Sequence, residues 1–294
     1  MERVLTVGLD GSPESLAAAH WAADEAQRRK LTLRLLHAWP LLAPEPTAVP
    51  SEVDQNYWAK RLVHNAQTEL QAHHPGLTVV GNLVADDAQD ALIQAASESE
   101  MLVLGSRGLT PVESYFLGDI SMSVVASAEG PVVLVRADKR AKRAEGSSAS
   151  ESGAAGGVVV GLKLHGPCND LLEFAFTTAA ARGVPLRAVH GRAIPIHAYA
   201  PWGVDHTVTQ EIIQDAQKHL RQTLRPWCEK FPGVAVTDDI RLESPARVVV
   251  AAAERAELLI VGRRSHHAPA PRLGSVAQAA VHHARCPVAV IPHE

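Results

Sequence analysis

Short apolar runs alternate along the chain with longer segments in which apolar residues recur at helical spacing. In the first half, the apolar runs are residues 3–9, 32–38, 77–84, 101–105 and 132–135. The segments with helical spacing between them are residues 13–29, 56–72, 88–98 and 118–128. The apolar runs lack a strict two-residue alternation, which is typical of strands buried on both faces of a parallel sheet. The pattern therefore predicts a parallel sheet whose strands are joined by helical crossovers.

The second half repeats this pattern. Residues 33–37 (LRLLH) match 186–190 (LRAVH), and residues 100–105 (EMLVLG) match 257–262 (ELLIVG), so the offset grows from 153 to 157. A polar tract of small residues separates the copies and cannot form a core. We predict domain 1 at residues 1–137, a flexible linker at 138–156 and domain 2 at 157–294. The predicted fold class is α/β, with two tandem Rossmann-like domains, each a five-stranded parallel doubly wound sheet.

Ligands of such sheets bind at the carboxyl ends of the strands. After the fourth apolar run comes the segment Gly105, Ser106, Arg107, Gly108, and Gly118 follows after nine intervening residues, where a helix is expected. Glycines allow successive backbone N–H groups to turn toward an anion, and a helix N-terminus adds further donors. This loop therefore favours phosphate binding, the alternative being a structural turn.

The spacing G-x2-G-x9-G resembles that of the universal stress protein (UspA) family, as do the opening segment VGLDGS at 7–12 and the strand GPVV at 130–133. The resemblance covers nearly the whole chain, twice. It implies two adenine nucleotide alpha hydrolase-like domains. In the first, the adenine and ribose pocket would comprise Gly8, Asp10 and the main chain at Ala38, with the phosphates held by Gly105, Gly108 and Gly118. It also implies that the two copies pair through their last strands as an intrachain pseudo-dimer, and it leaves a homodimer open.

One position departs from the family pattern in the first copy. Asp119 stands where the family has Ser or Thr, which places a carboxylate where a hydroxyl would meet phosphate. Two unit charges roughly 4 Å apart repel by about 4 kcal/mol at an effective dielectric of about 20. Either Asp119 coordinates a Mg²⁺ that bridges to the phosphates, or it caps the helix and leaves Ser121 and Arg107 to meet the ligand.

The second copy departs elsewhere. Lys163 replaces Asp10, so the ribose acceptor is lost. Its loop keeps Gly262, Gly274 and Ser275, but Ser265 replaces the second glycine and the spacing is one residue shorter. Arginines in this loop suit an anion even where the adenosine pocket is lost; they are Arg263, Arg264 and Arg272.

Charge and composition narrow the classes of function. The net charge of −4 and the absence of a basic block on any predicted helix argue against nucleic acid and anionic lipid as partners, and no apolar run is long enough to span a membrane. The first residues read as a strand and not as a secretory signal, so we expect a cytoplasmic protein. Neither the three cysteines nor the fifteen histidines have metal-ligand spacing.

The leading hypothesis is a tandem universal stress protein that binds ATP or a related adenine nucleotide as a regulatory ligand, mainly through domain 1, in the response to stress. We expect no catalysis, because no pairing of a nucleophile with a base emerges. One alternative is a nucleotide-independent interaction protein whose two sites have decayed, which Asp119 and Lys163 favour. An ATP-hydrolysing enzyme ranks last.

Overall fold

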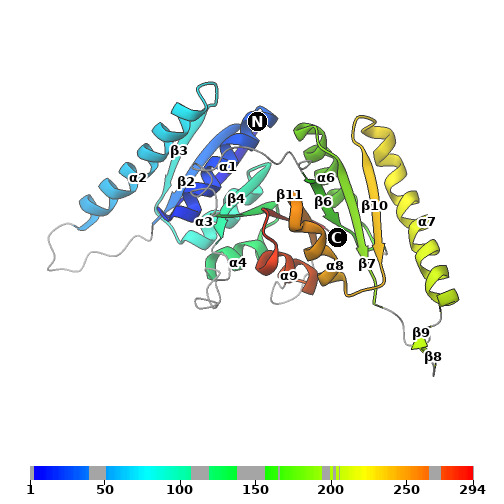
Figure 1. Ribbon diagram of the computed structural model, residues 1–294. Helices are drawn as coiled ribbons and strands as arrows, with labels where there is room; N and C mark the ends of the chain where they lie inside the picture. Colours follow the sequence, from blue (N-terminus) through cyan, green and yellow to red (C-terminus); the bar gives the residue numbers. More distant parts are fainter. Residues whose placement is uncertain are drawn as a thin grey trace, which may run out of the picture. The chain divides into compact units, whose positions relative to one another are not determined.

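The computed structural model describes residues 3–39, 51–106, 119–137, 156–164, 166–193, 199–200, 203–204, 206–264 and 273–293 (Figure 1). The chain divides into two compact units, Met1–Ser148 and Ala149–Glu294. We refer to these units as domain 1 and domain 2. Each contains one complete copy of the repeat.

Domain 1 is a five-stranded sheet with helices on both faces. Its strands are β1 (Val4–Gly8), β2 (Thr32–Ala38), β3 (Val79–Val84), β4 (Met101–Ser106) and β5 (Val132–Arg136), and its helices are α1 (Pro13–Arg29), α2 (Ser51–His73), α3 (Ala88–Ser97) and α4 (Asp119–Ser127). Every pairing within the sheet is parallel, in the order β5-β4-β1-β2-β3. The strand order reverses between β1 and β4, which defines a doubly wound sheet.

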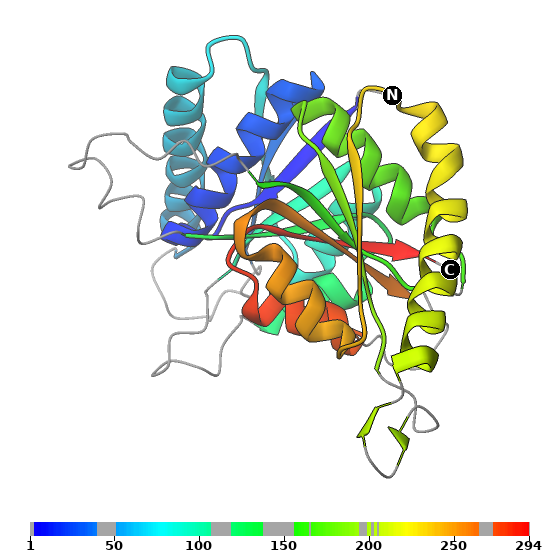
Figure 2. The ribbon, with the colours of Figure 1, turned by 45° about the vertical axis from the view of Figure 1, so that its right-hand side comes forward.

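Domain 2 repeats this arrangement. Its strands are β6 (Gly156–Gly161), β7 (Leu186–Gly191), β10 (Val236–Arg241), β11 (Ala256–Arg264) and β12 (Val288–His293), and its helices are α6 (Asn169–Arg182), α7 (His206–Lys230), α8 (Pro245–Ala252), the short 3₁₀-helix η2 (Ala253–Arg255) and α9 (Ser275–His283). The sheet is again parallel, in the order β12-β11-β6-β7-β10. Helix α7 packs along the edge strand β10 (Figure 2). The predicted fold class is confirmed.

Three details differ from the sequence prediction. Helix α2 begins at Ser51, five residues before the expected start at Asn56. The sequence did not predict this first turn because its residues are polar and show no apolar periodicity. Strands β8 (Tyr199–Ala200) and β9 (Gly203–Val204) form an antiparallel pair where domain 2 carries extra residues, and two-residue strands are too short for periodicity to reveal. Gly156 belongs to β6 and not to the linker, because its backbone pairs with that of Ala256.

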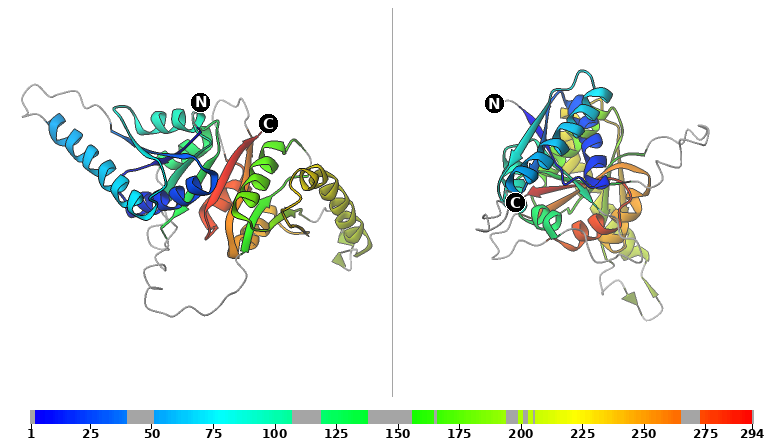
Figure 3. Two further views of the ribbon diagram at one scale, coloured as in Figure 1. Left: turned by 90° about the horizontal axis from the view of Figure 1, so that it is seen from above. Right: turned by 90° about the vertical axis from the view of Figure 1, so that its left-hand side faces the viewer.

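Helix α1 shows how the sequence builds one layer of the core. Ser12 caps its N-terminus by accepting a hydrogen bond from the Ser15 backbone N–H, and Pro13 occupies the first turn. The helix ends at Lys30, whose backbone is left-handed at φ 55°. Its buried face consists mainly of alanines, namely Ala18, Ala19, Ala22, Ala23 and Ala26, which lets the helix lie close against the sheet. Helix α2 lies along β3 in the same domain (Figure 3).

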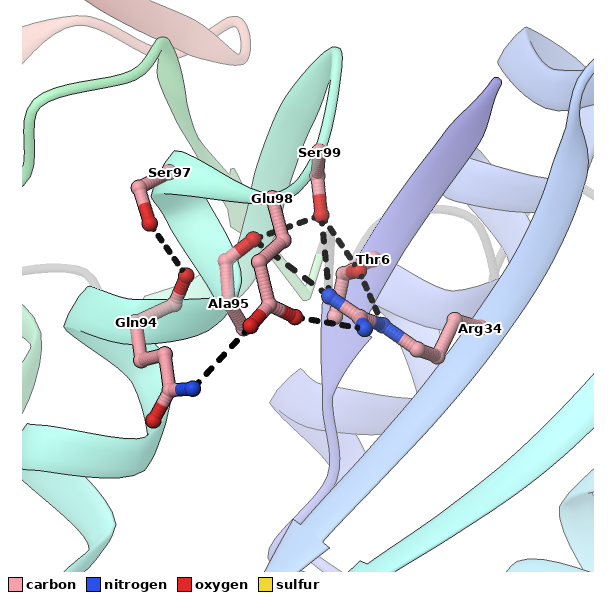
Figure 4. Close-up of polar contacts among 7 residues, drawn as sticks. All are labelled: Thr6, Arg34, Gln94, Ala95, Ser97, Glu98 and Ser99. Carbon is pink, nitrogen blue, oxygen red and sulfur yellow. Dashed lines mark hydrogen bonds and ion pairs between the residues drawn. The ribbon is translucent and has the colours of Figure 1, made fainter. Parts of the chain in front are cut away.

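A polar network on the sheet holds the end of helix α3 (Figure 4). The Arg34 guanidinium on β2 donates hydrogen bonds to Thr6 Oγ1 at 2.8 Å, Glu98 Oε2 at 3.0 Å and Ser99 Oγ at 3.2 Å. It also donates to the Ala95 carbonyl at 3.4 Å, where a positive charge complements the helix dipole. The network satisfies the fully buried Thr6 hydroxyl and joins β1, β2 and α3.

Domain 2 keeps one hydrogen bond of this network, from the arginine to a helix carbonyl, and lacks the three side-chain acceptors. Arg187 corresponds to Arg34, and its guanidinium donates to the Ala252 carbonyl, the counterpart of Ala95. The counterparts of Thr6, Glu98 and Ser99 are Val159, Arg255 and Ala256, whose side chains cannot accept these hydrogen bonds. The repeat therefore preserves the contact between the arginine and the end of the helix.

We predict that Arg34→Met lowers the free energy of unfolding of domain 1 by about 2 kcal/mol, because several charge-assisted hydrogen bonds are lost at once. Arg187→Met, which removes the one retained contact, should cost less. Urea unfolding followed by hydrogen exchange on peptides of each domain measures both.

Arg34 holds the pKa of the Glu98 carboxyl below its ordinary value by donating a hydrogen bond to it, with a second from Gln94. That part of the Arg34 effect should be present at neutral pH and disappear as the pH falls through the lowered pKa.

Candidate functional site

The strand register fixes which residues meet at the carboxyl edge of domain 1. Leu5 pairs with Met101 and Val7 with Val103 on the neighbouring strands β1 and β4. Continuing this register places Asp10, just beyond β1, level with Ser106 at the end of β4. The register therefore places Asp10 and Ser106 at the same level of the edge, at the topological switch point, where ligands of such sheets bind.

The carboxylate of Asp10 is oriented by the turn that follows it. One of its oxygens accepts hydrogen bonds from the Ser12 backbone N–H at 2.8 Å and from Ser12 Oγ at 2.5 Å. Gly11 between them has φ +83°, a conformation that L side chains rarely adopt, and Leu62 of α2 occupies the space where its Cβ would lie. The side chain of Asp10 is exposed at the mouth of the edge. The segment Asp10-Gly11-Ser12 therefore orients the acceptor and caps α1 in the same turn.

The main chain of Ala38 faces the end of β1. The Trp39 N–H donates to the Val84 carbonyl on β3 at 3.0 Å, and alternate residues of a strand direct their backbone groups to opposite sides. The backbone groups of Ala38 thus point toward the side on which β1 has already ended at Gly8. This is the geometry that the predicted main-chain contact with adenine requires.

His37 holds the chain where it leaves β1. Its Nδ1 donates to the Leu9 carbonyl at 2.7 Å, and His190 makes the corresponding bond to the Leu162 carbonyl at 2.9 Å in domain 2. The two histidines thus support the edge by binding backbone carbonyls.

Ser106 provides a buried hydroxyl at this edge. The residue is 3% exposed, and its Oγ has no hydrogen-bond partner among the residues that the structure describes. Leaving such a group unsatisfied costs about 1–3 kcal/mol. Ser106 follows Leu104 by two residues on β4, so its side chain lies on the same face of the sheet as α3. The hydroxyl is therefore available to a ligand on that face.

The predicted glycines of the first domain have identifiable packing roles. A Cβ on Gly105 would lie 2.6 Å from the backbone of Glu14 and 2.7 Å from that of Ser15, so glycine is needed for α1 to approach β4. A Cβ on Gly8 would lie 2.8 Å from the Leu104 side chain. Direct contact of either residue with a nucleotide stays a prediction.

Three predicted phosphate-loop residues, Arg107, Gly108 and Gly118, lie outside the described residues. Helix α4 begins at Asp119 in the described part of the chain. The Mg²⁺ and N-cap alternatives for Asp119 stay predictions. In domain 2 the corresponding helix has Gly274 as its N-cap and begins at Ser275. Ser121 is the third residue of α4 and is half-buried.

The same edge of domain 2 differs in shape as well as in sequence. The connection from β6 to α6 covers residues 162–168, against residues 9–12 in domain 1. Its helix is preceded by Cys168, which makes no capping hydrogen bond through its side chain. Gly262 packs against the His293 ring, which lies 2.6 Å from where a Cβ would stand. The adenosine side of this edge is thus rebuilt, whereas Gly274 and Ser275 still begin a helix.

Sequence reasoning missed two residues at the edge of domain 1. Trp39 follows Ala38 and stacks on His37 with a centroid distance of 6.4 Å and an interplanar angle of 24°. Arg136 of β5 pairs in register with Ser106 and adds a basic residue at this level of the edge. Each of them comes directly after a predicted apolar run. Aligning the ends of the predicted strands across the sheet would therefore have found both residues.

Comparison with known proteins agrees with this geometry. The model of the universal stress protein family matches residues 1–136 and 157–292. The chain belongs to this family. It is 31% identical over 296 residues to Universal stress protein Rv2005c of Mycobacterium tuberculosis, covering 97% of this chain and 96% of that protein.

Further matches are also universal stress proteins. Universal stress protein Rv2623 of the same organism is 29% identical over 299 residues, covering 97% of this chain and 95% of its own. A crystal structure of a universal stress protein from Archaeoglobus fulgidus has the same fold, with a TM-score of 0.65 at 17% identity, covering 99% of this chain and 98% of that one. Within the described part of the chain, no helix is long and apolar enough to cross a membrane, and no three His, Cys, Asp or Glu side chains are grouped to hold a metal ion.

We predict that Gly105→Ala destabilises domain 1 by about 1–3 kcal/mol, because the added methyl group overlaps the backbone of α1. Gly76→Ala is the matched control, since nothing lies within 4 Å of its Cβ position. Thermal unfolding compares the two variants. Equal stability of both would contradict the close approach of α1 to β4.

Proposed function

We propose that this protein binds ATP or a related adenine nucleotide through domain 1 and acts as a non-catalytic, nucleotide-regulated protein of the cytoplasm. The observation that supports this most directly is the register of β1 and β4, which, continued beyond β1, places Asp10 level with Ser106 at the switch point of the sheet. An exposed carboxylate suits the ribose hydroxyls, which donate hydrogen bonds. A buried hydroxyl on the next strand suits a phosphate oxygen, which accepts them.

The remaining contacts fit around these two residues. The main chain of Ala38 faces the side on which β1 has ended, and it offers one donor and one acceptor to adenine. The aromatic surface of Trp39 lies beside it. Arg136, level with Ser106, supplies a cation on the phosphate side. Neither contact requires the strands to move.

Negative charge at this edge bears on the form of the ligand. Asp86, Asp87 and Asp90 lie at the start of α3, on the same edge as Asp10, and Asp119 begins α4. These carboxylates disfavour free ATP, whose triphosphate is strongly anionic. The Mg²⁺ complex of the nucleotide carries less charge and could approach them, so we propose this complex as the bound form.

A second candidate function is interaction with other proteins independently of nucleotide. Lys163 in domain 2 and Asp119 in domain 1 favour it, since each removes one group that the family pattern provides. The two candidates differ in whether nucleotide binds at all, and the variants below decide between them.

Asp10→Asn and Ser106→Ala should each weaken the binding of Mg·ATP by about tenfold or more, because the first removes the negative charge and one acceptor oxygen and the second removes a hydroxyl donor. Isothermal titration of the full chain measures the dissociation constants. Asp24→Asn is the matched control, because Asp24 is an exposed acid near the other end of α1.

Wild-type protein that neither releases an adenine nucleotide on denaturation nor binds added Mg·ATP would overturn the proposed function and favour the interaction protein. A loss of affinity in Asp24→Asn equal to that in Asp10→Asn would show that only net charge matters.

Asp119→Ser should raise the affinity for ATP in EDTA, because a carboxylate at the first position of α4 is replaced by a hydroxyl. With Mg²⁺ present the gain should shrink, since the metal ion already offsets the charge. Titrations with and without Mg²⁺ measure the two differences. Unchanged affinity in EDTA would show that Asp119 does not face the phosphates.

A further inference from the structure

The sheet of domain 1 ends at β3, whose outer side is open in the described part of the chain. Strand β3 is the last in the order of the strands and pairs there only with β2. The Leu33 N–H donates to the Thr78 carbonyl at 2.9 Å, and the Trp39 N–H donates to the carbonyl of Val84 at 3.0 Å. Backbone groups of alternate residues point to opposite sides of a strand. The odd-numbered residues therefore direct their N–H and C=O groups away from the sheet. They are Val79, Gly81 and Leu83.

Helix α2 protects only the first part of this edge. Gln67 Nε2 donates a hydrogen bond to the Val79 carbonyl at 2.9 Å, in agreement with an outward direction of that carbonyl. No residue in the described ranges binds the outward groups of Gly81 and Leu83. Gly81 is exposed and Leu83 is half-buried. Unpaired backbone groups at a sheet edge are a template on which another extended chain can pair.

The sequence of β3 lacks the features that normally prevent such pairing. Natural edge strands are protected by charged side chains, by proline or by bulges. The six residues of β3, VVGNLV, include no charged residue and no proline. The edge strand of domain 2, β10, reads VTDDIR. Its Asp239 accepts two hydrogen bonds from Arg241, and its Asp238 pairs with Arg221 of α7 at 3.4 Å. Domain 2 therefore has a charged edge where domain 1 has an uncharged one.

The same flank of domain 1 exposes apolar side chains. The structure describes four large hydrophobic residues that are exposed, and all four belong to domain 1. Two of them, Tyr57 and Trp58 of α2, are 59% and 61% exposed, and their ring centroids lie 5.8 Å apart. A third, Val80 of β3, is 42% exposed. Tyrosine and tryptophan are enriched at protein–protein interfaces, so this flank has the composition of a contact surface.

Strand β3 is complementary to an inverted copy of itself. In an antiparallel pair centred on Gly81, the two Gly81 residues face each other, and Val79 of each copy faces Leu83 of the other. All of these residues direct their backbone groups outward, so hydrogen bonds form at each of these positions. The Val79 carbonyl has a second lone pair beside the one that Gln67 uses. Because β3 has no charged side chain, its own residues bring no like charges together.

The equivalent strand of domain 2 is not complementary to itself. Strands β3 and β10 each pair with the second strand of their sheet, and the register makes Asp238 the counterpart of Gly81. The same antiparallel pair formed by β10 would place two Asp238 carboxylates opposite each other. Like charges directly opposite in a sheet are destabilising. Self-pairing is therefore compatible with the edge of domain 1 and opposed by the edge of domain 2.

We propose that domain 1 joins two copies of this chain through antiparallel pairing of their β3 strands, centred on Gly81. The product is a reversible homodimer with two-fold symmetry, whose interface consists of the outer side of β3 flanked by α2. The interface is separate from the proposed nucleotide site, because β2 lies between β3 and β1. The dimer therefore forms without nucleotide.

Sedimentation equilibrium of the full chain without nucleotide, from about 1 to about 200 µM, tests the proposal. A monomer–dimer equilibrium with a dissociation constant of about 1–100 µM is expected. The double variant Val80→Asp with Asn82→Asp should weaken it by about tenfold or more, because residue 80 of each copy faces residue 82 of the other and like charges then meet. Both side chains point away from α2, since the Cβ position of Gly81 between them lies 2.7 Å from the Val63 side chain of that helix. Thermal unfolding checks that the variant is folded.

The matched control places the same added charge on domain 2. Thr237→Asp on β10 with Gln222→Glu on α7 changes two exposed positions and should leave the association unchanged.

Hydrogen exchange of the wild-type chain tests the same interface without a substitution. The amides of Gly81 and Leu83 should exchange about tenfold more slowly or less above the dissociation constant than below it, and those of β10 should not change. The proposal is overturned if the chain is monomeric up to about 200 µM, since the edge would then be left to a strand of another protein. It is also overturned if the β3 amides exchange equally at both concentrations, if the folded Asp double variant associates like wild type, or if the control weakens association as much.

Discussion

Parallel pairing of the first and fourth strands of each domain is the constraint on which the site depends. Because β1 and β4 run in the same direction and in fixed register, the residues just beyond their ends lie level with one another. Asp10 meets Ser106 in domain 1, and Lys163 meets Arg263 in domain 2. The backbone thus determines where the functional side chains meet, and the sequence at these few positions determines what they can bind.

The duplication separates the scaffold from the site. Contacts that hold the scaffold are kept in both copies: His37 and His190 bind equivalent carbonyls, and Arg34 and Arg187 bind the ends of equivalent helices. These contacts are made to backbone, whose position is shared by both domains. Residues of the carboxyl edge differ in charge between the two copies, and the order of the strands in the sheet is the same in both. One fold therefore presents an acidic edge and a basic edge.

Most of the fold was predictable because buried parallel strands and amphipathic helices leave strong periodic patterns. Helix α1 and strand β2 have the predicted bounds. The start of α2 and the hairpin β8-β9 were not predictable, since polar or very short segments have no period. At the site, glycine spacing identified the loop, but the packing role of Gly105 depends on how close α1 lies. The role of Asp119 stays a prediction, because the residues directly before it lie outside the described part of the chain. The roles of Arg107, Gly108 and Gly118 stay predictions.

The number of nucleotides bound per chain tests the asymmetry of the two domains most directly. Native mass spectrometry or calorimetry of the full chain with saturating Mg·ATP gives this number. If only domain 1 retains the adenosine acceptor, one nucleotide binds per chain, and Asp10→Asn weakens its binding by about tenfold or more. Two equivalent nucleotides per chain, or one that binds Asp10→Asn with unchanged affinity, would contradict this assignment.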